Sequence, residues 1–328
     1  MRIAVSPAIV YPARARTPTP QAGQPCGIIP IMAMGDSFSF IRDSQPQQPR
    51  AETEYQPQTA EEARRRGDAA LRQGEYEEAF RYYKLAIQMD GDSSERYMQL
   101  GDAYAFADQP ARALAYYQRA RKMNPRDPEP YFALGEIYRR YGRYDAAIAH
   151  FRRAIEYGAD NAFVQFKYAE VLALSQQYTK AVEAGRAAVN HEPSNGFYRF
   201  WLADLLEHIG EIDEALQEME IATLLNPEDD YYHFRFGLLC IENEDLPRAV
   251  ECFQRALAIK PQRALYLTLL GDVYTLLARS REAQHAYQQA GDLDGYDRAE
   301  LQRARQIAGL DNGRLGNCTD GDSPARRE

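Results

Sequence analysis

The side chains that most often carry out chemistry in proteins are sparse and scattered in this sequence. Its five histidines include no HExxH zinc motif, because His191 and Glu192 run directly into Pro193. The nucleophile motif GxSxG and the phosphate-binding motifs GxxxxGK[ST] and GxGxxG do not occur either. The sequence therefore predicts no metalloprotease centre, no serine-hydrolase centre and no phosphate-binding loop, and we expect a protein that is not an enzyme.

The cysteines give no sign of a metal or disulfide framework. Cys26, Cys240, Cys252 and Cys318 form no CxxC pair and are too few for either kind of site. We expect Cys240 and Cys252 to be packed core thiols in a reducing compartment. No cofactor and no metal are expected.

Net charge and hydropathy limit the class of partner. The chain has 328 residues, a net charge of -9 and a sequence pI near 5.3. Nonspecific nucleic-acid binding requires dense Lys and Arg, so it is not expected. No run approaches the length of apolar residues that a membrane span needs. We expect a cytoplasmic protein without an integral membrane segment, with an organelle or peripheral membrane association as the alternative.

The two ends differ in composition from the middle. Residues 1–59 hold nine of the eighteen prolines and a Gln/Pro-rich stretch, so we expect a disordered leader. The first 35 residues of this leader contain Arg but no acid before Asp36, which leaves three explanations: a transit segment, a start codon assigned too far upstream, or a plain disordered tail. Residues 309–328 are expected to be a second disordered tail.

The middle of the chain is a repeat with a period of 34 residues. Written in rows from Ala60, it aligns seven times without an insertion; positions within a row are called columns here, and the rows are repeats one to seven. Columns 20 and 27 are Ala in every repeat, column 8 is Gly or Ala, and column 24 is aromatic in five repeats. Columns 4, 7, 8 and 11, and columns 20, 24, 27 and 28, recur at helical spacing, which predicts two amphipathic helices per repeat, A and B. Small residues at columns 8, 20 and 27 would let the helices approach closely.

These columns resemble the tetratricopeptide repeat family. Repeat two carries the fullest match: Tyr97, Leu100, Gly101, Tyr104, Ala113, Tyr117, Ala120 and Pro125. The resemblance implies an all-α fold, a right-handed α-solenoid of seven repeats in which the A helices line a concave channel. The predicted repeats are 60–93, 94–127, 128–161, 162–195, 196–229, 230–263 and 264–297. Residues 298–308 are predicted to form a capping helix, which such a stack needs at its end, and Gly309 would end it.

One side of the A helices is not needed for stacking. Columns 2, 5, 9 and 12 lie roughly 130° around the helix from columns 4, 8 and 11. In the family this side lines the channel, and here it carries aromatic residues beside carboxylates. The predicted peptide-binding residues are Phe132, Phe163, Phe166, Phe197, Phe200, Trp201, Tyr231 and Phe234, with the acids Asp102, Glu136, Glu170 and Asp204.

We therefore expect a scaffold that binds a protein or peptide with apolar and basic residues in this groove. The competing interpretation is structural: the aromatic residues would partly cover a neighbouring helix and the acids would keep the surface soluble. An assembly factor for a membrane protein complex, similar to those that help build photosystems, is the functional alternative. RNA binding of the pentatricopeptide kind is disfavoured by the 34-residue period and the acidic charge.

Binding of the acidic C-terminal tails of chaperones is not expected. Family members that bind such tails carry a set of Lys, Asn and Arg side chains on three successive repeats. The corresponding positions here are Arg64, Asp68, Gln99, Glu129 and Ala133, and no other register restores the set.

Overall fold

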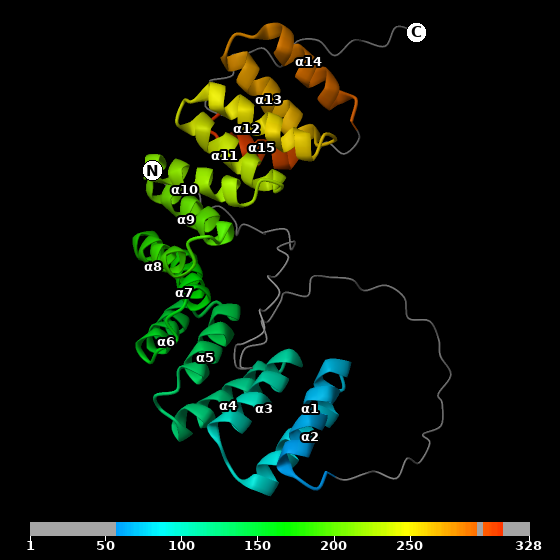
Figure 1. The fold of residues 1–328 in the computed structure, drawn as a ribbon, viewed down its shortest axis with the longest axis vertical. Helices are drawn as coiled ribbons and strands as arrows, with labels where there is room; N and C mark the ends of the chain where they lie inside the picture. The colour runs from blue at the N-terminus through cyan, green and yellow to red at the C-terminus, as the bar shows by residue number, and fades with distance from the viewer. Residues whose placement is uncertain (1–56, 294–297, 311–328) are drawn as a thin grey trace, which may run out of the picture. The chain divides into compact units, whose positions relative to one another are not determined.

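The computed structural model describes residues 57–293 and 298–310, and these residues form α-helices joined by short turns. The predicted leader and C-terminal tail lie almost entirely outside the described residues. Seven A helices alternate with seven B helices along the chain (Figure 1). The A helices are α1 (Ala60–Gln73), α3 (Ser94–Phe106), α5 (Pro128–Arg140), α7 (Ala162–Leu174), α9 (Gly196–Ile209), α11 (Asp230–Glu242) and α13 (Ala264–Leu276). The B helices are α2 (Tyr76–Asp90), α4 (Pro110–Met123), α6 (Tyr144–Glu156), α8 (Tyr178–His191), α10 (Ile212–Leu225), α12 (Leu246–Ile259) and α14 (Ser280–Gly291).

Local sequence signals set where each helix starts and stops. Six A helices begin after a Thr, Ser, Asp or Asn whose side chain accepts a backbone N–H of the first turn: Thr59, Ser93, Asp127, Asn161, Asn195 and Asp229. All seven turns between helices A and B place their column 15 residue at positive φ. Three of these residues are Gly, and the other four are Asp108, Gln176, Glu244 and Ala278. The positive φ of this turn is therefore kept even in the four repeats whose column 15 residue is not glycine.

Each helix packs mainly on its neighbours in the chain, A against B within a repeat and B against the next A. The Ala side chains of columns 20 and 27 are all buried at these contacts. The prediction of an all-α solenoid of paired helices is confirmed. After α14 the chain adds α15 (Arg298–Ile307), which packs on α13 and α11 with Leu301 and Ala304 buried.

Columns 8 and 24 fit each other across the two helices of a repeat. A Cβ atom added at Gly101 would lie 2.5 Å from Cε1 of Tyr117, so only glycine leaves room for this ring. Gly67, Gly135, Gly237 and Gly271 face column 24 rings in the same way. Repeats four and five have Ala at column 8, and there column 24 is Gly185 or Met219 instead of a ring. Side-chain volume is thus exchanged between the two columns, as close packing requires.

We predict opposite sensitivity at two helical glycines. Gly101→Ala should lower the free energy of unfolding by about 1–3 kcal/mol, because the new methyl group collides with the buried Tyr117 ring. At Gly185 an added Cβ would lie 3.3 Å from Cδ1 of Leu202 and 3.4 Å from Cδ1 of Leu205, which can shift. Gly185→Ala should therefore be neutral or stabilising by up to about 1 kcal/mol through helix propensity. Urea unfolding of the two variants beside the parent chain tests this, and equal losses would contradict it.

Candidate functional site

The candidate face is the side of the A helices that carries the predicted site residues. Four of its phenylalanines, from α5, α7 and α9, are half-buried and form two ring pairs: Phe132 with Phe163, and Phe166 with Phe197. The ring centroids of Phe132 and Phe163 are 5.8 Å apart, and those of Phe166 and Phe197 are 5.1 Å apart. We call these four residues the aromatic strip. It crosses three successive repeats and keeps part of each ring in solvent.

Three of the aromatic residues that were predicted to contact a peptide lie in the core instead. Phe200, Trp201 and Phe234 are only 2%, 7% and 7% exposed. Phe200 stacks on Tyr232 with centroids 4.5 Å apart, and Phe234 stacks on Tyr266 at 5.1 Å. Both tyrosines occupy column 3 of the following repeat, so the next A helix covers the ring. The expectation that these side chains are exposed anchors is wrong for this structure; Tyr231 stays half-buried between Phe200 and Phe234.

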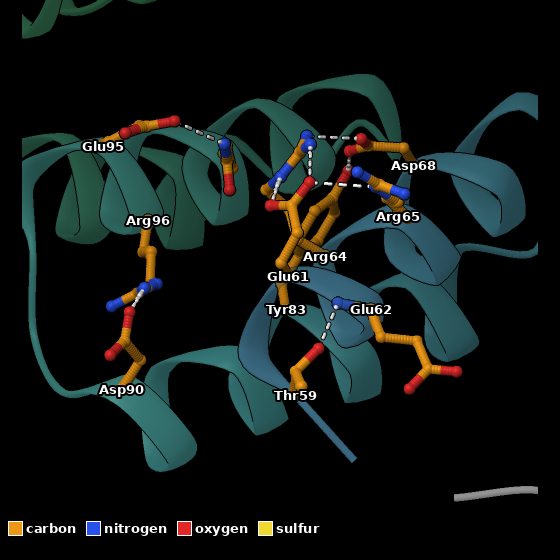
Figure 2. A network of polar contacts seen from close by, with 11 residues as sticks. Thr59, Glu61, Glu62, Arg64, Arg65, Asp68, Tyr83, Asp90, Glu95 and Arg96 are labelled. Carbon is orange, nitrogen blue, oxygen red and sulfur yellow. Dashed lines mark hydrogen bonds and ion pairs between the residues drawn. The ribbon is translucent and has the colours of Figure 1, made fainter. Parts of the chain in front are cut away.

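The acids of column 9 have partners within the protein. In repeats one, two and seven the column 9 Asp accepts a hydrogen bond from the column 24 Tyr hydroxyl at 2.7 Å: Asp68 from Tyr83, Asp102 from Tyr117 and Asp272 from Tyr287. Figure 2 shows this contact in repeat one, where Arg64 also donates to Asp68 at 2.7 Å. Asp272 is fully buried and receives two hydrogen bonds of 2.8 Å from Arg305 of α15. The acidic column is therefore partly structural.

Where the column 24 residue has no hydroxyl group, Arg or Lys side chains donate hydrogen bonds to the column 9 acid instead. Arg139 donates to both oxygens of the buried Glu136 at 3.0 and 3.1 Å and lies 3.5 Å from Glu170. Lys167 donates to Glu170 at 3.0 Å and its Nζ lies 5.4 Å from the Phe166 ring centroid. Two cations thus balance two acids beside the aromatic strip. The group of Arg139, Lys167, Glu136 and Glu170 therefore lacks the net negative charge that was expected here.

Asp204 belongs to a buried polar group at the other end of the candidate face. Arg235 donates to Asp204 at 2.6 Å and to Glu207 at 2.9 Å. Burial raises the pKa of Glu207 to about 7, even though Arg235 opposes this shift. Asp204 is 7% exposed and already paired, so a ligand would have to displace Arg235 to reach it.

Asp102 differs from the related carboxylates. Asp68 has Arg64 and Asp272 has Arg305, but no cation forms an ion pair with Asp102 among residues 57–293 and 298–310. Burial raises the pKa of Asp102 to about 6; the Tyr117 hydrogen bond opposes this shift, and the charge of Glu129 adds to it. Burial also raises the pKa of Glu129 itself. This part of the candidate face holds negative charge that the protein does not neutralise.

A pH dependence of stability follows for Asp102. Its folded-state pKa is above the unfolded value, so its contribution is fully present below about pH 4 and is lost as the pH rises to about 6. Asp102→Asn keeps an acceptor for Tyr117 and removes the buried charge, and it should raise the free energy of unfolding by about 1 kcal/mol at neutral pH. Asp68→Asn is the matched control, which should lower stability because Arg64 loses one of its two acidic partners and keeps only Glu61. Urea unfolding at acidic and neutral pH measures both, and a loss of stability in Asp102→Asn at neutral pH would contradict the assignment.

Comparison with known proteins decides the family. The family model described as tetratricopeptide repeat matches residues 48–94, 98–162, 142–196 and 202–264, which together make up more than half of the chain. The chain belongs to the tetratricopeptide repeat family. The repeats of this family serve as scaffolds for protein–protein interaction and bind protein or peptide partners.

Two solved tetratricopeptide repeat structures illustrate the likeness of fold. One is YrrB, described as having an unusual peptide-binding site, with 23% identity and a TM-score of 0.51 over 56% of this chain and 95% of that one. The other is the C-terminal part of a repeat protein from Cytophaga hutchinsonii, with 15% identity and a TM-score of 0.58 over 65% of this chain and 88% of that one. At these identities the likeness concerns the fold alone. No curated protein sequence matches the chain.

The described residues of this tetratricopeptide repeat protein have further features outside the candidate face. In the described part of the chain, no three His, Cys, Asp or Glu side chains gather so that they could hold a metal ion. Cys240 and Cys252 are buried, and the hydrogen bond between them together with burial raises the pKa of the Cys240 thiol. Two open hollows lie at turns, one lined by Gly74 and Gln109 and the other by Pro247 and Leu277, and neither includes the aromatic strip. Every helix that the structure describes is too short or too polar to cross a membrane.

Proposed function

We propose that this protein is a non-enzymatic scaffold that binds a peptide segment of a partner protein across the candidate face. The segment would place apolar side chains on the aromatic strip and a Lys or Arg side chain beside Asp102. The observation that carries the proposal is the half-buried state of two phenylalanine pairs that span three successive A helices. The peptide-binding site described for YrrB, which has the same fold, agrees with it.

The aromatic strip suits apolar contact. Phe163 and Phe197 lie in the first turns of α7 and α9, and each rests against another ring of the strip. Rings held in this way lose little side-chain entropy when a partner covers them. Burial of aromatic side chains at the centre of an interface typically supplies most of the binding energy. The strip would therefore provide affinity.

The place beside Asp102 suits a cation. Arg64 and Arg305 show, within the same protein, how a guanidinium pairs with a Tyr-bonded Asp of this column. At Asp102 the ligand would supply the missing cation, and Glu129 would add to the attraction. Such charge complementarity favours a basic segment and disfavours an acidic one. The basic residue would therefore fix the direction in which the segment lies.

Selection from a random peptide library on the purified protein tests the proposal. Enriched peptides should combine aromatic or aliphatic residues with Lys or Arg. Affinity for a selected peptide should fall about tenfold or more in a Phe163→Ala, Phe197→Ala double variant. The matched control is Tyr76→Ala with Tyr141→Ala, two exposed aromatic residues outside the candidate face. Equal affinities for the two double variants, both verified as folded by circular dichroism, would refute the aromatic strip as the binding site.

The basic contact has its own test. Asp102→Asn should weaken binding of a selected peptide that contains Lys or Arg, although the same substitution stabilises the fold. A peptide with the cation replaced by Gln should bind both proteins alike. Because these two effects of Asp102→Asn have opposite signs, loss of structure cannot imitate the loss of binding.

A further inference from the structure

The B helices distribute their charge very unevenly. Helix α4 carries Arg112, Arg119, Arg121 and Lys122 and no acid, whereas α10 carries Asp213, Glu214, Glu218 and Glu220 and no cation. The turn after each helix continues the contrast, with the exposed Arg126 after α4 and the exposed Glu228 after α10. In a protein with a net charge of -9, the basic helix is the exception.

The cations of α4 are not neutralised within the described residues. No carboxylate there lies within ion-pair distance of the four α4 cations, and three of them lie over tyrosine rings instead. The Arg112 guanidinium is 5.6 Å from the Tyr104 ring centroid, Arg119 is 5.3 Å from that of Tyr116, and Arg121 is 5.8 Å from that of Tyr131. These rings hold the guanidinium groups in place but leave their charge uncompensated. Such a face attracts an acidic surface.

Helix α10 is only partly neutralised. Glu214 pairs with Arg186, Glu218 with Arg199 and Glu220 with Arg248. Asp213 and Glu228 have no such partner in the part of the chain that the structure describes. The helix therefore keeps a negative surface whose charge is opposite to that of α4.

Helix α10 also exposes aliphatic side chains that the other B helices do not expose together. Leu224 is 69% exposed, the largest exposure among the large hydrophobic residues that the structure describes. Ile221, three residues before it, is 37% exposed, and Leu225, directly after it, is 39% exposed. On α4 the exposed large hydrophobic residue is Met123. The aliphatic stems of Arg119 and Lys122 can cover apolar side chains while their charged groups reach acids. An apolar centre with an acidic rim thus matches a face with Met123 and a basic rim.

We propose that α10 of one copy of this protein docks on α4 of a second copy. The occupant is a second copy because the same chain supplies both surfaces with opposite charge, and each surface has the apolar residues that the other can cover. The contact joins two different surfaces, so each pair leaves one α4 and one α10 free for further copies. The proposal concerns the B helices and is independent of peptide binding on the A helices.

Sedimentation of the full chain over a range of concentrations tests the contact. The average mass should rise with concentration at low ionic strength, about 0.05 M, and fall toward the monomer at about 0.5 M, where charges are screened over a few ångströms. Leu224→Ser should also lower the average mass, because it removes the apolar centre without disturbing the core.

Charge exchange makes the test specific. Arg112→Glu with Arg119→Glu and Lys122→Glu makes α4 acidic, because three glutamates then stand beside Arg121. Asp213→Lys with Glu228→Lys makes α10 and the turn after it basic, because Glu214, Glu218 and Glu220 are already paired with arginines. Each of these two variants alone should associate about tenfold or more weakly than the parent chain. A one-to-one mixture should associate again, because the changed α4 matches the changed α10 and the unchanged helices match each other. Arg255→Glu with Arg281→Glu, two exposed cations of α12 and α14, is the control that should behave like the parent.

Three results would overturn the proposal. The first is a parent chain that stays monomeric at low ionic strength up to about 100 μM, a concentration at which even weak specific contacts form. The second is association that the control variant weakens as much as the α4 and α10 variants do. The third is a mixture of the two reversed variants that remains monomeric while both are folded by circular dichroism.

Discussion

Arg305→Met is expected to detach α15 from the C-terminal end of the stack. Asp272 is fully buried, and the Tyr287 hydroxyl would be its only remaining partner among those that now hold it. Removing one member of a buried ion pair leaves an uncompensated charge, which costs about 3–5 kcal/mol. Because helices of a solenoid contact mainly their neighbours, the loss should be local. Hydrogen exchange should therefore speed up in α13 and α15 and stay unchanged in α3.

The double variant Arg305→Met with Asp272→Asn identifies the cause. It removes the buried charge together with its partner, so it should recover a large part of the lost stability. Arg303→Met, two residues away and exposed, should have no effect. Exchange rates in α15 that remain like those of the parent in Arg305→Met would show that the ion pair does not hold this helix.

Phe200→Ala should destabilise the centre of the stack by about 3–5 kcal/mol, the usual cost of emptying a buried phenylalanine site. The Phe200 ring is 2% exposed and lies nearly parallel to the ring of Tyr232, with an angle of 8° between them. Phe163→Ala removes a ring of the same size from the half-buried aromatic strip and should cost about 1 kcal/mol, because less apolar area is lost. Both residues occupy the candidate face, but only Phe163 is exposed enough to contact a partner.

Thermal and urea unfolding of the two variants separate these roles. Phe200→Ala should shift both midpoints strongly, and Phe163→Ala should leave them near those of the parent while weakening peptide binding. Similar midpoints for the two variants would mean that exposure does not distinguish core from contact residues on this face.

The columns of small residues made the fold predictable from the sequence. Alanine recurs at columns 20 and 27, and the structure buries each of these residues where two helices meet. The exchange of volume between columns 8 and 24 is visible in the sequence too, since Ala169 and Ala203 accompany the two repeats that lack a ring. Such signals are local and periodic, so they specify which helix faces touch.

Burial on the candidate face depended on residues that the column analysis did not weigh. Phe200 and Phe234 stack on Tyr232 and Tyr266 at column 3 of the next repeat. The Phe166 ring is tilted by 44° to Tyr198 in the same column and stays half-buried. Likewise the Tyr at column 24 and the Asp at column 9 are bonded, which makes the acidic column partly structural. Both signals are contacts between residues of different columns. An analysis of each column alone therefore cannot show which neighbouring residue buries or binds a given side chain.

The repeats of this protein are not interchangeable modules, because repeat four borrows its packing from repeat five. Gly185 has no column 24 side chain, and Leu202 and Leu205 of α9 reach to 3.3 and 3.4 Å from the position that a Cβ atom at Gly185 would take. A shortened chain that ends between α8 and α9 would therefore lack the atoms that complete its last repeat. Anyone dividing this protein for expression should keep α7 through α10 in one piece.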